Sequence, residues 1–156
     1  TRELAQQIEK EAKIFSRSSK GFKTTIVVGG TNMSEQRSDL RGGVEVCVAT
    51  PGRLIDHLHQ GNTNLARVSV VVLDEADRML DMGFIPQVKR IVRTTPRRED
   101  RQTLLFSATF TQDVMNLAQQ WTFEPVTVEI EPERVATASV DHSQDTFGQR
   151  AAAGSR

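Results

Sequence analysis

Short apolar runs rich in β-branched residues alternate along the chain with stretches whose apolar residues recur at helical spacing. Strand-like runs occupy residues 25–28, 45–49, 68–73, 103–106 and 126–130. Helical spacing occurs at residues 2–16, 34–40, 53–59, 78–94 (with a break near Gly83) and 112–121. Such alternation predicts an α/β fold in which helices cover both faces of a parallel sheet.

Residues that favour helix ends stand at the predicted boundaries. Thr31 or Asn32 can cap the second helix, and Thr111 can cap the last one. Pro51 suits the first turn of the third helix, and Gly61 lies just past its end. These end signals support the boundaries that the periodicity predicts.

The pattern stops at about residue 131. Residues 135–156 are rich in Ala, Ser, Gln and Arg and hold few large apolar side chains, so this segment cannot bury enough surface to order itself. We expect one domain over residues 1–134 and a disordered or aberrant tail over residues 135–156.

Composition narrows the class of protein only a little. The net charge of zero does not exclude nucleic acid, because binding depends on a local basic face. No apolar stretch approaches the length of a membrane span, and we expect an intracellular protein. Cys47 lies in an apolar run and is expected to be a buried thiol, whereas His57 and His59 are expected on the surface of their helix. The chain enters a helical pattern directly from Thr1, which suggests a fragment of a longer protein.

Three acidic residues follow the third apolar run. Asp74, Glu75 and Asp77 stand just beyond its carboxyl end, where open α/β sheets bind ligands. Nucleotide hydrolases place acids there to hold Mg²⁺ and to position a water. An acidic helix start, favoured by the helix dipole alone, explains the same residues without any chemistry.

Four further segments lie at strand ends or helix starts and offer groups that suit phosphate. They are residues 1–5 (Thr-Arg-Glu-Leu-Ala), Gly29-Gly30, residues 50–53 (Thr-Pro-Gly-Arg) and residues 107–109 (Ser-Ala-Thr). Glycines allow close backbone approach, and an arginine at a helix N-terminus binds anions. Taken singly, each segment is more often just a turn or a helix start.

In this order and at these intervals, the five segments resemble the motifs of the DEAD-box ATP-dependent RNA helicases. The resemblance covers about residues 1–135 and implies part of an N-terminal RecA-like (P-loop NTPase) domain. It also implies ATP and Mg²⁺ as cofactors, and RNA as a partner bound through its backbone without regard to sequence. A location in the nucleus, nucleolus or cytoplasm would follow.

The resemblance also implies a role for each matching residue. Asp74 would hold Mg²⁺ through water, and Glu75 would orient and deprotonate the attacking water. Asp77 would hydrogen-bond the segment of Ser107 and Thr109, which couples ATP to strand separation. The residues that would grip the RNA backbone are Thr1, Arg2, Gly29, Gly30, Thr50 and Arg53.

The chain departs from the family pattern in what it lacks. It holds no Gly-Lys-Thr or Gly-Lys-Ser phosphate loop and no second RecA-like domain, so we expect this polypeptide alone to bind ATP poorly, and neither to hydrolyse it nor to unwind RNA. The alternatives are a non-catalytic RNA- or partner-binding module and a non-functional truncated product. Without the strand of the phosphate loop, we expect a sheet of four paired strands, with residues 126–130 detached or moved into the gap.

Overall fold

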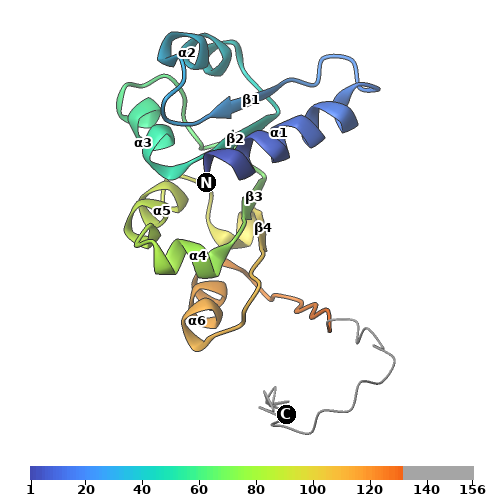
Figure 1. Cartoon of the computed structure of the whole chain (residues 1–156), viewed down its shortest axis with the longest axis vertical. Coiled ribbons are helices and arrows are strands. Elements are labelled where there is room, and N and C mark those ends of the chain that lie inside the picture. The colour runs from blue at the N-terminus through green and yellow to red at the C-terminus, as the bar shows by residue number, and fades with distance from the viewer. Residues whose placement is uncertain (132–156) are drawn as a thin grey trace, which may run out of the picture. The chain divides into compact units, whose positions relative to one another are not determined.

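The structure is a computed structural model and describes residues 1–131 (Figure 1). Residues Thr1–Pro125 form one compact unit, and a second unit begins at Val126. The expected tail at residues 135–156 lies outside the described residues. Within the described part of the chain, no helix is both long enough and apolar enough to cross a membrane.

The compact unit is an α/β fold with parallel strands, as the sequence predicts. The helices are α1 (Arg2–Ser16), α2 (Met33–Gly42), α3 (Pro51–His59), α4 (Ala76–Asp81), α5 (Ile85–Val92), the 3₁₀ helix η1 (Arg98–Asp100) and α6 (Gln112–Trp121). The strands are β1 (Thr24–Val27), β2 (Val46–Ala49), β3 (Val70–Leu73) and β4 (Gln102–Leu105). The predicted bounds of α1 and α6 are confirmed, and Gly83, at a φ of 72°, lies in the break between α4 and α5.

The expectation of one four-stranded sheet is wrong. The strands form two separate parallel pairs, in which Val27 is level with Ala49 and Leu73 is level with Leu105. Strand–helix alternation predicts parallel pairing, but it does not specify which strand edges meet. Residues 126–130, which begin the second unit, form no strand.

Helices cover both faces of the β1–β2 pair. The hydroxyl of Thr24 donates to Glu9 of α1 at 3.5 Å, and the hydroxyl of the next residue, Thr25, donates to Asp39 of α2 at 3.0 Å. Successive residues of a strand point to opposite faces, so the two bonds locate α1 and α2 on opposite sides of this pair. The expected two-sided cover is therefore present here.

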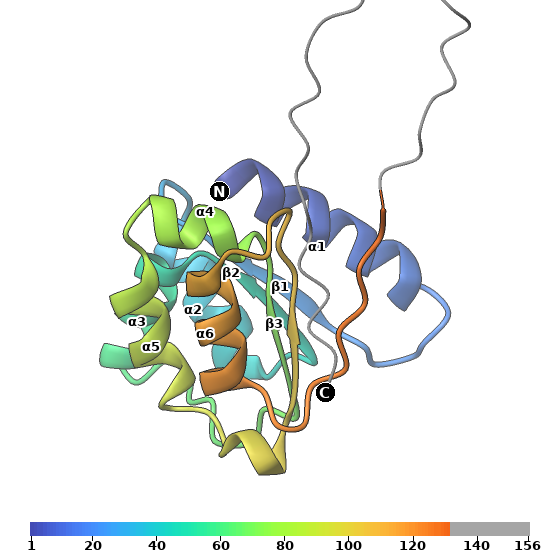
Figure 2. The ribbon, with the colours of Figure 1, turned by 90° about the horizontal axis from the view of Figure 1, so that it is seen from below.

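The β3–β4 pair is covered on one face only. Leu73 and Leu105 pack against buried side chains of α5 and α6, and Figure 2 shows both helices on one side of β3. On the opposite face Val72 is 55% exposed and Leu104 is 38% exposed. Within the described residues, this half therefore leaves part of one strand face open.

The two halves meet through α3 and α5. Ile91 of α5 packs against the buried cluster of Val27, Leu40 and Leu54, which belongs to the first half. Close by, a guanidinium nitrogen of Arg90 lies 3.0 Å from Nε2 of His59. Apolar contact between these helices therefore holds together two sheets that share no ladder.

Cys47 is exposed, so the expectation of a buried thiol is wrong. It stands level with Thr25 across the β1–β2 ladder, on the strand whose other edge has no partner strand among residues 1–131. An apolar run predicts a strand but does not show how far its neighbours reach over each residue.

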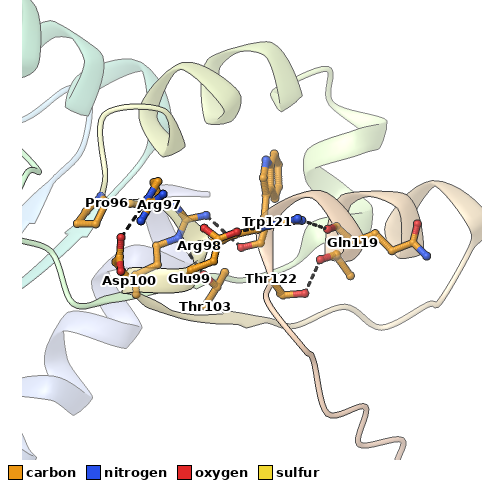
Figure 3. A network of polar contacts seen from close by, with 11 residues as sticks. Pro96, Arg97, Arg98, Glu99, Asp100, Thr103, Gln119, Trp121 and Thr122 are labelled. Carbon is orange, nitrogen blue, oxygen red and sulfur yellow. Dashed lines mark hydrogen bonds and ion pairs between the residues drawn. The ribbon is translucent and has the colours of Figure 1, made fainter.

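An arginine-centred network ties the end of α6 to the start of β4 (Figure 3). The Arg101 guanidinium donates to the carbonyls of Pro96 at 2.6 Å and Trp121 at 3.0 Å, and to the hydroxyls of Thr95 and Thr103. Arg98 donates to the carbonyl of Gln119 at 2.7 Å. Cations at a helix C-terminus satisfy carbonyls that lack helical partners, so these arginines stabilise the end of α6.

We predict that Arg101→Lys lowers the free energy of unfolding by about 1–3 kcal/mol, because an ammonium cannot reach the four acceptors of the guanidinium fork. Arg97→Lys is the control. Arg97 is exposed, and among residues 1–131 its one ion pair is with Asp100, so this change should alter stability by less than about 0.5 kcal/mol. Urea unfolding followed by the fluorescence of Trp121 measures both. Equal midpoints for the two variants would contradict the role of Arg101.

Candidate functional site

Backbone hydrogen bonds join the two loops that leave the β3–β4 pair. The amide of Phe106 donates to the carbonyl of Leu73 at 2.9 Å, and the amide of Ala76 donates to the carbonyl of Phe106 at 3.0 Å. The chain after β3 is therefore fastened to the chain after β4. This brings Asp74, Glu75 and Asp77 beside the Ser-Ala-Thr segment.

The first two acids occupy a strained turn. Glu75 has φ 53° and ψ 52°, a left-handed conformation that costs a non-glycine residue about 1–2 kcal/mol. Its amide donates to the Asp74 carboxylate at 2.8 Å, and its own carboxylate lies 3.5 Å from Nε of Arg78. Asp74 is exposed and Glu75 half-buried, so both carboxylates remain accessible to a ligand.

Asp77 and Thr109 are brought together. The Thr109 hydroxyl donates to the Asp77 carboxylate at 3.3 Å across 32 residues of sequence. Ser107 is not bonded to Asp77; its hydroxyl donates to the carbonyl of Thr109 at 2.7 Å. The acid therefore contacts the Ser-Ala-Thr segment through the threonine, whose backbone the serine holds.

Two of the residues expected to contact RNA meet at the turn after β1. Gly30 has a φ of 76°, and a Cβ atom built on it would lie 2.5 Å from a guanidinium nitrogen of Arg2. Arg2 can lie there only because Gly30 carries no side chain. Gly29 has no such close neighbour within 4 Å.

Arg53 reaches the same turn from α3. One of its guanidinium nitrogens donates to the carbonyl of Thr31 at 3.2 Å. Thr50 is tied to the neighbouring strand, because its amide donates to the carbonyl of Val27 at 3.0 Å. Thr1 accepts a hydrogen bond from the amide of Leu4 and so caps α1. The glycine turn thus has one arginine from α1 and one from α3.

Sequence reasoning missed a buried polar cluster behind this turn. Gln36, His57 and Asn62 are 5%, 0% and 3% exposed. The expectation that His57 lies on the surface is wrong, whereas His59 is exposed as expected. The signal was available, because His57 follows the buried Leu54 by three residues and so shares its helix face.

The acidic residues after β3 offer few protein ligands for Mg²⁺. Among residues 1–131 no group of three or more His, Cys, Asp or Glu side chains is placed to hold a metal ion. Magnesium usually keeps several waters and binds through one or two carboxylates together with substrate phosphates. The accessible carboxylate of Asp74 fits that mode of binding.

A family model described as DEAD/DEAH box helicase matches residues 1–117. The chain belongs to this family. It is 54% identical over 142 residues to the ATP-dependent RNA helicase RhlB of Pseudomonas aeruginosa, covering 90% of this chain and 36% of RhlB. It is 55% identical over 130 residues to the ATP-dependent RNA helicase DBP2 of Eremothecium gossypii, covering 83% of this chain and 23% of DBP2.

A solved structure agrees with the family membership. The crystal structure of a DEAD box protein from the hyperthermophile Methanococcus jannaschii matches with a TM-score of 0.72 at 38% identity, over 80% of this chain and 33% of that one. The RecA-like α/β fold of a DEAD-box protein is thereby shown. The chain spans about a third of the length of RhlB and of the Methanococcus protein.

We predict that the strain at Glu75 is measurable as stability. Glu75→Val should lower the free energy of unfolding by about 1–2 kcal/mol relative to Glu75→Gln, because β-branched residues tolerate a positive φ worst. Glu75→Gly should be at least as stable as Glu75→Gln, which serves as the matched control for the lost charge. Chemical denaturation of the three variants decides the point; equal stability of the Val and Gln variants would show that the turn relaxes.

Proposed function

We propose that this chain forms the RNA-gripping and carboxylate-bearing part of the N-terminal RecA-like domain of an ATP-dependent RNA helicase. The observation that carries the proposal is the convergence of Arg2 and Arg53 on the turn formed by Gly29, Gly30 and Thr31. Two guanidinium groups beside exposed glycine backbone offer positive charge and N–H donors together. Phosphate oxygens are the natural partner of such a surface.

The RNA contact that we propose is to the sugar-phosphate backbone. Arg2, Arg53, Thr1, Thr50 and the glycine turn offer donors suited to phosphate, and backbone contacts of this kind carry no sequence information. Binding should therefore be insensitive to base identity and should weaken with salt. The relatives named as RNA helicases support RNA over other polyanions.

The acids after β3 supply the ATP-dependent part of the proposal. Asp74 would hold Mg²⁺ through water, and the ion would neutralise charge on the phosphates of a bound nucleotide. Glu75 would orient the attacking water, and the bond from Thr109 to Asp77 would link the acids to the Ser-Ala-Thr segment. We propose that the 156 residues alone do not turn over ATP, since they include no phosphate loop.

A non-catalytic RNA-binding module is the second candidate. The paired arginines at the glycine turn favour it, because they can contact RNA without any nucleotide. The two candidates differ in what ATP does. RNA binding that Mg²⁺ and ATP do not change is expected of the 156 residues by themselves. RNA binding that depends on nucleotide requires the carboxylates after β3.

We predict that the chain binds labelled oligo(U) and oligo(A) of equal length with similar affinity, with or without Mg²⁺ and ATP. Arg2→Gln should weaken binding to both and reduce the slope of log K against log salt by about 0.7, which corresponds to one lost contact with a single strand. Fluorescence anisotropy at several salt concentrations measures both quantities.

The matched control is Arg67→Gln, because Arg67 is exposed and lies between α3 and β3. This variant should bind like the unmodified chain. If the two variants weaken binding equally, or if oligo(U) and oligo(A) differ by more than about tenfold, the proposed backbone contact is wrong.

A further inference from the structure

Behind the glycine turn, three buried side chains form one hydrogen-bonded row. Nδ1 of His57 lies 3.0 Å from the amide nitrogen of Asn62, and Nε2 of His57 lies 2.9 Å from the amide oxygen of Gln36. The amide nitrogen of Gln36 then donates to the carbonyl of Val28 at 3.0 Å and to the hydroxyl of Thr31. The row therefore runs from the end of α3, through α2, to the turn after β1.

The contacts allow only one arrangement of protons. An amide nitrogen donates and cannot accept, so Nδ1 of His57 must accept from Asn62 and carries no hydrogen. The hydrogen is then on Nε2, which donates to Gln36. A neutral imidazole in this tautomer satisfies every bond in the row.

The Gln36 amide oxygen is also where Arg53 is held. It accepts from the Arg53 guanidinium at 3.3 Å as well as from His57, while the same guanidinium nitrogen donates to the carbonyl of Thr31. One buried amide thus holds both the backbone of the turn and a cation expected to meet RNA.

We propose that Gln36 and His57 are positioning residues for the RNA-contact surface, and that protonation of His57 releases the turn and Arg53. The proposal rests on the proposed function for RNA contact. A second hydrogen, on Nδ1, would face the Asn62 amide nitrogen and set two donors against each other. The Asn62 amide nitrogen also donates to the side-chain oxygen of Gln60 at 3.2 Å, which opposes turning this amide over. The imidazole must therefore move, and its bond to the Gln36 amide oxygen is disturbed.

The charges around His57 favour its neutral form. Burial lowers the pKa of His57 below its ordinary value of 6.5, and the positive charges of Arg53 on α3 and Arg37 on α2 lower it further. Asp56 on α3 acts in the opposite direction but has the smallest effect, and Asn62, from the loop after α3, is uncharged. The unfolded chain therefore binds the proton at higher pH than the folded chain.

The direction of the pH effect follows from this difference in proton binding. The stabilisation by the neutral row is complete above about pH 6.5, and it is lost as the pH falls below that value toward the folded pKa. RNA affinity should fall at lower pH, where His57 of the folded chain itself takes up the proton. This direction is diagnostic, because acidification makes a protein more positive and by itself strengthens binding to a polyanion.

The test is a pH titration of the 156-residue chain from pH 8 to 5, followed by ¹⁵N NMR of the imidazole and of the backbone amides of Gly29, Gly30 and Thr31. We expect the Nε2–H tautomer at pH 7.5, and amide shifts at the turn that follow the titration of His57. Turn amides that do not follow His57, or an Nδ1–H tautomer, would overturn the inference whatever RNA does.

Anisotropy with oligo(U) over the same pH range supplies the functional readout. Gln36→Leu removes the amide that holds both Arg53 and the carbonyl of Val28, and it should lower RNA affinity at pH 7.5 about three- to tenfold, the equivalent of one net hydrogen bond. Gln112→Leu, the same change at an exposed position of α6, should have little effect, and equal losses in the two variants would overturn the inference.

The outcomes separate the inference from the proposed function. Absence of RNA binding by the unmodified chain at pH 7.5 overturns the proposed function, while the NMR titration still decides whether His57 controls the turn. Binding that stays constant or strengthens through the pH range in which the imidazole of His57 titrates overturns the inference and leaves the proposed function standing. The unmodified chain alone yields these results, so they do not depend on the folding of any variant.

Discussion

In-register parallel pairing is the constraint on which the rest of the structure depends. Because Leu73 is level with Leu105, and Val27 with Ala49, the loops that leave each pair of strands start side by side. One pair brings the acids to the Ser-Ala-Thr segment, and the other brings the glycine turn to Thr50 and the start of α3. Apart from Thr1 and Arg2 at the start of α1, every candidate group therefore lies in a segment that directly follows a strand of one of the two ladders.

Short polar contacts then orient the side chains on these segments, which the strand ladders do not position by themselves. At one edge a strained Glu75 and the bond from Thr109 to Asp77 arrange acids that are otherwise open to water. At the other edge two arginines approach the glycine turn, and Gln36 with His57 supports it from behind. The positions of the acids and of the two arginines thus depend on a few hydrogen bonds. A single substitution can remove each of these bonds.

Local sequence signals predicted the local features of the structure. The bounds of α1 and α6 followed from apolar spacing and cap residues, and the family's motifs pointed to the side chains that the loops carry. Which strand edges meet could not be predicted, since alternation alone does not specify strand order. The burial of His57 was missed because its polarity suggested the surface, although its spacing from Leu54 placed it on the apolar helix face. Long-range contacts decided each of these points.

The most direct test of the account is a ¹H–¹⁵N titration of the chain, first with single-stranded oligo(U) and then with Mg²⁺ and ATP. The account predicts that RNA shifts the amides of Gly29, Gly30, Thr31 and Arg53, and that nucleotide leaves Asp74 unmoved. Saturable nucleotide shifts at Asp74, or RNA shifts confined to the arginines around Arg101, would contradict it.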